Sequence, residues 1–136
     1  MKIHNIPGKL EVTWREDVKA IVDTWTSYFV TMEDFKEAVL IKGLNHAKEN
    51  GGIAWIVDSS IAKGAFSQEI QDFIGTDLFP AFQKNGIKYF ITINSNVSAI
   101  TKMTVNEYSF KTALSGLKLI EINSIDEAIT CLKNLS

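Results

Sequence analysis

Two clusters of polar residues in this chain have types and spacing that suit ligand or partner binding. Each cluster follows a run of apolar residues typical of a buried strand, residues 53–57 and 87–93. Parallel strands end at the same edge of a sheet, and ligands of open α/β sheets bind beyond that edge. We therefore predict a ligand- or partner-binding edge that contains Asp58, Ser59, Ser60, Lys63, Ser67, Asn94, Ser95, Asn96 and Ser98.

These residues also have a purely structural explanation. Ser and Asn commonly cap helices and bond to loop backbone, and Ser67 stands where a helix is expected to begin. The free N–H groups of helix N-termini at this edge would instead suit a phosphate or a carboxylate. The sequence leaves both interpretations open.

An aromatic segment offers a second candidate surface. Trp25, Tyr28 and Phe29 lie within five residues, just before an expected helix start at Thr31. We expect this segment to fold over one open edge of the core. The alternative is an exposed apolar patch that binds a protein partner or a small apolar ligand.

The residues that usually carry catalysis or bind metals are isolated in this sequence. His4 and His46 are far apart and do not have metal-ligand spacing with another His, Cys or carboxylate. Cys131 falls among the apolar residues of the last expected helix, which favours a half-buried thiol. Phosphate-loop, nucleophile-elbow and His-Glu metal motifs are missing from the sequence. We therefore expect a protein that is not an enzyme and needs no cofactor or metal.

Composition narrows the class of protein further. A chain of 136 residues with 46% hydrophobic residues suits one domain, residues 1–136, with one core. Its 14 Lys and Arg balance 16 Asp and Glu, and Arg15 is the only arginine, so nucleic acid is not an expected partner. No run approaches the ~20 apolar residues of a membrane span. The single cysteine and the lack of a signal peptide favour the cytoplasm.

Apolar patterning predicts strands that alternate with helices. The expected strands are residues 10–14, 18–25, 53–57, 87–93 and 117–122. The first two should form a hairpin, and His4 should lie near a loose terminus. The first helix should start at a Thr31 cap and run to about Asn50, with Gly51 as a left-handed stop.

Three further helical segments are expected. Ser67 should open the second helix, which Pro80 should kink or divide in two. Residues 98–113 should form two short helices. Ser124 and Glu127 have the spacing of a capping box, which should start the last helix.

The predicted order is β-β-α-β-α-β-α-β-α. It indicates an α/β fold with a mostly parallel sheet and an N-terminal antiparallel hairpin. Because helices would cover mainly one face of this sheet, a homodimer that covers the other face is an expected partner arrangement.

This order, read with particular segments, resembles a known family. The segments span most of the chain from about Lys9 onward and are Ala54-Trp55-Ile56-Val57-Asp58, Phe79-Pro80, Asn85-Gly86-Ile87-Lys88-Tyr89-Phe90, Lys102-Met103-Thr104-Val105-Asn106 and Ser124-Ile125-Asp126-Glu127-Ala128. Together they resemble the SpoIIAA-like (STAS) fold, closest to a group of small, mostly uncharacterised bacterial domains. That group is also likened to CRAL-TRIO lipid-binding modules.

The resemblance implies a non-catalytic regulatory or protein-interaction domain, like the STAS anti-sigma-factor antagonists. The CRAL-TRIO likeness implies the alternative, a carrier domain for a small apolar ligand or lipid. In the antagonists, the first Ser of an Asp-Ser-Ser-Gly sequence is phosphorylated by a partner kinase. The matching stretch here is Phe66-Ser67-Gln68-Glu69, without that Asp or Gly, so we expect Ser67 to cap the helix and keep phosphorylation as the alternative.

Overall fold

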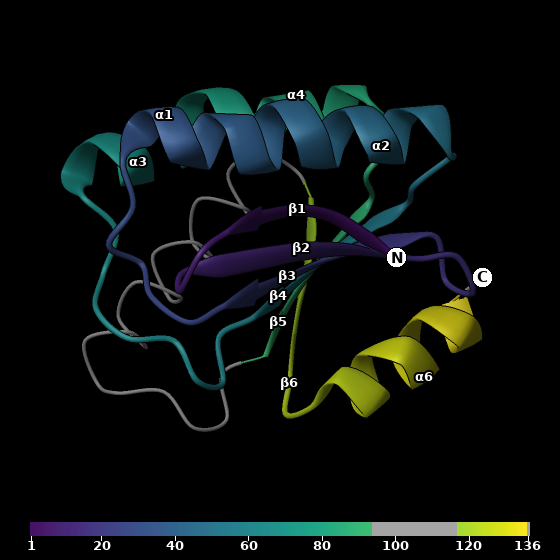
Figure 1. The fold of residues 1–136 in the computed structure, drawn as a ribbon. Coiled ribbons are helices and arrows are strands. Elements are labelled where there is room, and N and C mark those ends of the chain that lie inside the picture. Colours follow the sequence, from purple (N-terminus) through teal and green to yellow (C-terminus); the bar gives the residue numbers. More distant parts are fainter. Residues whose placement is uncertain (94–116, 136) are drawn as a thin grey trace.

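A mixed six-stranded sheet runs through the part of the chain that the structure, a computed structural model, describes: residues 1–93 and 117–135 (Figure 1). The strands lie in sequence order across the sheet. They are β1 (Lys2–Ile6), β2 (Leu10–Arg15), β3 (Ala20–Trp25), β4 (Ala54–Asp58), β5 (Tyr89–Ile93) and β6 (Lys118–Ile122). β1 to β3 pair antiparallel and β3 to β6 pair parallel, which confirms the α/β class.

The first strand was not expected from the sequence. Residues 2–6 form β1 rather than a loose terminus, and Ile6 pairs with Leu10 across a turn in which Gly8 has a φ of 73°. Lys9 N–H closes this turn by donating to Ile6 O at 2.9 Å. The segment has few alternating apolar residues, so its strand conformation depends on the partner strand β2 rather than on a local pattern.

The predicted hairpin is present as β2 and β3. Six residue pairs run from Leu10↔Trp25 to Arg15↔Ala20. β3 begins two residues later than expected because Lys19 has a φ of 52°, a left-handed conformation that belongs to the turn.

The first helical run connects β3 to β4 and consists of α1 (Met32–Phe35), η1 (Lys36–Gly43) and α2 (Leu44–Glu49). Thr31 Oγ1 caps it by accepting from Asp34 N–H at 3.1 Å. The run ends at Asn50, and Gly51 has a φ of 71°. The predicted start and stop are therefore confirmed. Its central section, η1, has π-helical turns.

The second helical run connects β4 to β5 and consists of α3 (Gln68–Phe73), η2 (Ile74–Leu78) and α4 (Phe79–Lys84). Ser67 caps it, as predicted. Pro80 lies in the first turn of α4, directly after the π-helical η2. Because proline lacks the N–H of a regular helix bond, the helix path adjusts at this point without dividing the run in two.

The last helix, α6 (Ile125–Leu135), follows β6. Ser124 Oγ accepts from Glu127 N–H at 3.2 Å, which is one half of the predicted capping box. The Glu127 carboxylate accepts from Asn123 N–H at 3.1 Å, one residue before the usual position. The two helices expected over residues 98–113 lie outside the described residues.

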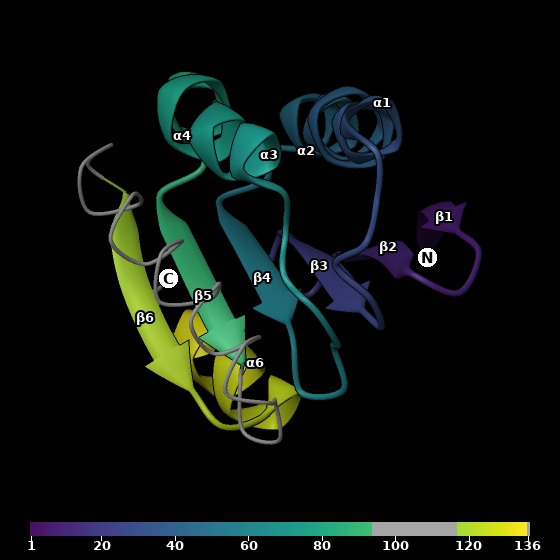
Figure 2. The same ribbon diagram turned by 90° about the vertical axis from the view of Figure 1, so that its left-hand side faces the viewer.

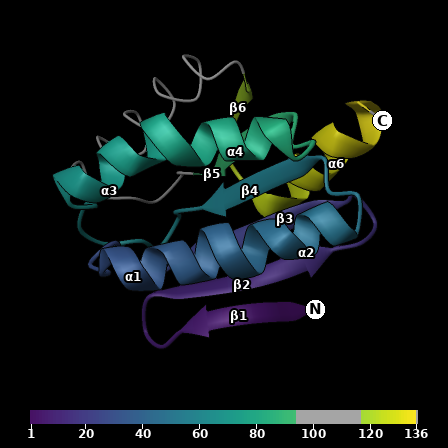
Figure 3. The same ribbon diagram turned by 90° about the horizontal axis from the view of Figure 1, so that it is seen from above.

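The helices lie on both faces of the sheet. The two helical runs lie side by side over one face, and α6 lies below the other (Figures 2 and 3). The larger core contains the rings of Trp25, Trp55 and Phe82 between the sheet and the two runs. The smaller core packs Ala128 and Leu132 of α6 against the opposite face.

This arrangement changes one expectation. α6 covers the second face over the middle of the sheet, with Ala20, Ala54 and Ile91 beneath it. The reason for expecting a homodimer, an uncovered second face, therefore does not hold for β3 to β5. In the described part of the chain, no helix has the length and apolar character of a membrane span.

Gly43→Ala is expected to destabilise the chain, although alanine favours helices over glycine. A Cβ at Gly43 would lie 2.8 Å from Cη2 of Trp55, a buried ring that is stacked on Phe82. Relief of this clash requires the core to shift, so we expect the free energy of unfolding to fall by about 1–3 kcal/mol. Urea denaturation measures this change.

The matched control for Gly43→Ala is Lys42→Ala, at an exposed neighbouring position of the same helix. It should change the free energy of unfolding by no more than ~0.5 kcal/mol. Equal stability of the two variants would contradict the contact between Gly43 and Trp55.

Candidate functional site

The carboxyl ends of β4 and β5 meet at one edge of the sheet. The two strands are parallel neighbours, in register from Ala54↔Tyr89 to Asp58↔Ile93. The juxtaposition on which the predicted binding edge depends is therefore present. Four of the predicted site residues, which follow β5, lie outside the described residues: Asn94, Ser95, Asn96 and Ser98. The loop after β4 is the half of the edge that the structure describes.

Asp58 is engaged in the turn that follows β4. Its Oδ1 accepts from the N–H of Ser60 at 3.1 Å and from the hydroxyl of Ser60 at 2.7 Å. This is the local side-chain-to-backbone bonding that Asp commonly provides in turns. The Asp58 carboxylate therefore shapes the start of the loop.

Ser59 is a buried anchor of the same loop. Its hydroxyl hydrogen-bonds to the hydroxyl of Tyr28, and its N–H donates to Ile93 O at 2.7 Å. Burial raises the pKa of Tyr28, which keeps its hydroxyl neutral and able to donate. Because Ser59 is fully buried, it fixes the loop and is not accessible to a ligand.

The loop after β4 is also paired with the loop after β3. Ser27 and Lys63 form a parallel bridge. Lys63 N–H donates to Thr26 O at 3.1 Å, and Tyr28 N–H donates to Lys63 O at 2.9 Å. We call residues 26–31 and 59–67 together the paired loops. The Lys63 side chain is exposed on them.

The aromatic segment divides between the core and the surface. Trp25 and Tyr28 are buried, with ring centroids 5.0 Å and 4.4 Å from that of Phe66. These two residues therefore close the edge of the core, as expected. The alternative, an exposed patch that includes them, is wrong for Trp25 and Tyr28. Phe29 is 64% exposed and its ring lies against Gly64, which leaves no room for a Cβ there.

A second exposed apolar residue was missed in the sequence. Ile61, in the loop after β4, is 59% exposed. It lies in a polar loop without helix or strand periodicity. An isoleucine among the polar residues of a loop could have indicated an exposed apolar side chain. Ser67 is exposed at the end of this loop, and its Oγ accepts from Ile70 N–H at 3.2 Å, the capping role expected for it.

A buried carboxyl in β3 was also missed. Asp23 is 2% exposed and faces the larger core. Its Oδ2 accepts from Trp55 Nε1 at 2.7 Å, while its Oδ1 has no hydrogen-bond partner. Burial raises the pKa of Asp23 to about 7, against the opposite effect of the bond from Trp55. Strand alternation in the sequence could have indicated this burial, because Asp23 shares a face of β3 with the apolar residues Ile21 and Trp25.

A cavity of about 20 Å³ lies beside Asp23, between the sheet and both helical runs. A cavity of this volume has room for about one water-sized group. It is lined by Asp23, Trp25, Phe35, Val39, Trp55, Val57, Ile74, Leu78, Phe79, Phe82 and Phe90. An acyl chain does not fit this space.

The histidines and the cysteine stand apart from one another. His4 is half-buried on β1, and the ring of His46 on α2 lies edge-on to Trp14, 5.1 Å between centroids. Cys131 is a free, half-buried thiol on α6. Among residues 1–93 and 117–135, no three His, Cys, Asp or Glu are arranged to hold a metal ion.

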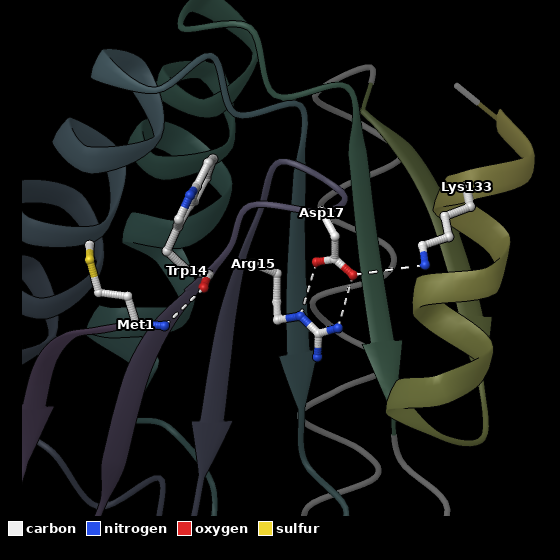
Figure 4. Close-up of polar contacts among 5 residues, drawn as sticks. All are labelled: Met1, Trp14, Arg15, Asp17 and Lys133. Atoms are coloured by element: carbon white, nitrogen blue, oxygen red, sulfur yellow. Dashed lines mark hydrogen bonds and ion pairs between the residues drawn. The ribbon is translucent and has the colours of Figure 1, made fainter.

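The opposite end of the sheet carries a cluster of polar contacts (Figure 4). Arg15 Nε and Nη2 donate to the two oxygens of Asp17 at 3.1 and 3.0 Å, and this bonding lowers the pKa of Asp17. Lys133 of α6 lies 4.0 Å from the same carboxylate, and the Met1 amino group donates to Trp14 O at 3.2 Å. Both ion pairs of Asp17 are exposed, so each contributes little stability, whereas the bond from Met1 to Trp14 is partly buried and ties the N-terminus to β2.

The described residues form an α/β fold with a mixed sheet, and the paired loops lie at the carboxyl end of its parallel strands. Comparison with protein-family models, with curated proteins and with solved structures finds no match to it. The resemblance to the STAS fold therefore remains a proposal.

Asp23 makes stability depend on pH. A carboxyl whose pKa rises on folding, here from 3.8 to about 7, stabilises the fold fully below the lower value and loses this contribution as pH rises through the upper one. At about 1.4 kcal/mol per unit, the free energy of unfolding should fall by roughly 4 kcal/mol between these values. Chemical denaturation across this pH range measures the loss.

Asp23→Asn isolates this contribution, because the other carboxyls titrate in both proteins. The stability of this variant relative to the unmodified chain should rise steadily between the two pKa values. A difference that does not change with pH would show that Asp23 titrates normally.

Proposed function

We propose that the chain is a non-catalytic protein-interaction domain of the regulatory kind, resembling STAS anti-sigma-factor antagonist modules, and that the paired loops bind its protein partner. The supporting observation is the exposure of two large apolar side chains, Phe29 and Ile61, at 64% and 59%, on loops joined by backbone hydrogen bonds. Exposed apolar side chains rimmed by polar groups are typical of protein interfaces.

The paired loops are held in place before any partner binds. The bond between Tyr28 and Ser59 anchors them from below, and the bridge between Ser27 and Lys63 joins them to each other. Lys9 also donates to the backbone O of Phe29. A surface that is already ordered loses less conformational entropy on binding, which favours a specific partner.

Polar groups surround the two apolar side chains. The ammonium group of Lys63 and the hydroxyl of Ser67 are exposed on the same loops, and the Ser60 hydroxyl is half-buried. These groups provide a polar rim, which adds orientation and specificity more than affinity. In this proposal the predicted polar edge contributes the rim, and Phe29 and Ile61 contribute the centre.

The chemistry of the described residues also supports a non-catalytic role. The Asp58 oxygen that accepts from the Ser60 hydroxyl also accepts from the Ser60 N–H, and Ser59 is fully buried against Tyr28, so both pairs have a structural role in the loop. A cytoplasmic location belongs to the same proposal, as does a bacterial regulatory context. A carrier of lipid or another apolar ligand has less support, because the cavity beside Asp23 holds only a water-sized group. Two larger surface hollows, one beside Trp14 and His46 and one along α6 at Cys131, are lined mainly by polar residues.

The double variant Phe29→Ser/Ile61→Ser should lose the protein partner. Both changes are at exposed positions, so the fold should keep its stability within ~0.5 kcal/mol per site, checked by circular dichroism and denaturation. We expect at least a tenfold loss in capture of the partner by the immobilised double variant, measured by quantitative affinity purification from the source organism.

The control is Ile41→Ser, which removes an apolar side chain 49% exposed on η1, away from the paired loops. It should retain the partner at the level of the unmodified chain. If every captured protein binds all three immobilised proteins equally, the paired loops are not the binding surface.

A further inference from the structure

The cavity beside Asp23 has no part in the proposed interaction surface. Among the described residues that line it, Asp23 is the only charged one, and it comes from the middle of β3. Oδ2 of that carboxyl is bonded to Trp55, and Oδ1 is buried without a hydrogen-bond partner. Leaving a buried polar oxygen unpaired is costly, so a group in this cavity that donates a hydrogen bond to Oδ1 would be strongly favoured.

The rest of the lining restricts what that donor can be. Among the described residues that line the cavity, Asp23 has the only side-chain hydrogen-bond acceptor, so the occupant must be a donor. The negative charge of the carboxylate form favours a positively charged donor over a neutral water. The volume of about 20 Å³ limits the occupant to a water-sized group.

Aromatic rings form most of the wall. Apart from Asp23, the lining includes the rings of Trp25, Phe35, Trp55, Phe79, Phe82 and Phe90. The electron-rich faces of aromatic rings attract cations, most strongly where water is excluded. A carboxylate beside such rings is the chemistry that recognises an ammonium group.

We propose that this cavity is a binding site for the ammonium ion, whose N–H donates to Oδ1 of Asp23. The carboxylate pairs the positive charge, and the surrounding rings contribute further attraction. An ammonium ion has about the size of a water molecule, so it meets the volume limit of the cavity.

No second charge faces the carboxyl within the described part of the chain. Val12 is its register partner on β2, and the lining residues of β4 are Trp55 and Val57. The two helical runs present Phe35, Val39, Ile74, Leu78, Phe79 and Phe82. Tyr28 is affected by the charge of Asp23, but its hydroxyl is bonded to Ser59 and stays neutral because burial raises its pKa.

Cation binding therefore competes with a proton for one carboxyl. Burial raises the pKa of Asp23 to about 7, so the carboxylate form is mostly present at higher pH. Affinity for the cation should be about tenfold higher near pH 8 than near pH 6. By linkage, the bound cation should in turn lower the pKa of Asp23.

The indole N–H of Trp55 provides the readout, because it donates to Asp23. Ammonium chloride is titrated into the folded chain up to ~100 mM while the indole resonances are followed by NMR. We expect a saturable shift of the Trp55 signal. The indole N–H of Trp14 donates to Glu16 outside the cavity and should not shift.

Potassium chloride and sodium chloride are the matched probes. The potassium ion has about the size of ammonium but no N–H, and sodium chloride matches the ionic strength. A shift of Trp55 by potassium as large as that by ammonium would overturn the proposed N–H donor site, as would the absence of a saturable shift near pH 8.

Asp23→Asn should abolish the saturable shift, whereas Asp58→Asn, at the end of β4 outside the cavity, should retain it. Should Asp23→Asn fail to fold, the pH titration of Trp55 in the unmodified chain decides. Its midpoint should move to lower pH in ammonium chloride but not in sodium chloride, and an unmoved midpoint overturns the proposal. This site is independent of the paired loops, so its failure leaves the proposed function intact.

Discussion

The indole of Trp55 is the point where the sheet meets both helical runs. Its ring stacks on Phe82 of α4 with centroids 4.2 Å apart, and it lies so close to Gly43 at the end of η1 that a side chain there would clash. Its N–H is bonded to Asp23 of the neighbouring strand. The side chain of Trp55 thus sets the distance of both helical runs from the sheet, and its indole N–H is hydrogen-bonded within the core. Large aromatic side chains commonly dominate core energetics in this way.

The parallel pairing of β3, β4 and β5 has a similar role at the carboxyl end of the sheet. Thr24 pairs with Asp58, and Asp58 with Ile93, so the segments that follow these strands start side by side. The buried bond between Tyr28 and Ser59 then joins two of these segments beneath the surface. The exposed side chains Phe29 and Ile61 therefore lie on loops that are anchored by buried, hydrogen-bonded residues.

Features set by neighbouring residues could be predicted from the sequence. Thr31 and Ser67 cap their helices as expected, and the apolar run before Asp58 is a central strand, because capping and burial of short apolar runs depend on local sequence. β1 and the surroundings of Asp23 could not be predicted in this way, although alternation along β3 places Asp23 on the same face as Ile21 and Trp25. β1 owes its conformation to pairing with β2, and the environment of Asp23 is created by helices distant in sequence.

The position of β1 at the outer edge of the sheet has a consequence for solubility. An outermost strand offers unpaired backbone groups to other chains and can seed aggregation. β1 is short, its register with β2 shifts between Lys2 and His4, and Lys2 is exposed. Irregular register and a charged side chain both hinder the addition of another strand. Behind it lies β2, longer and alternately buried at Leu10, Val12 and Trp14. β1 thus covers the backbone edge of β2, which would otherwise be more prone to pair with other chains and to form fibrils.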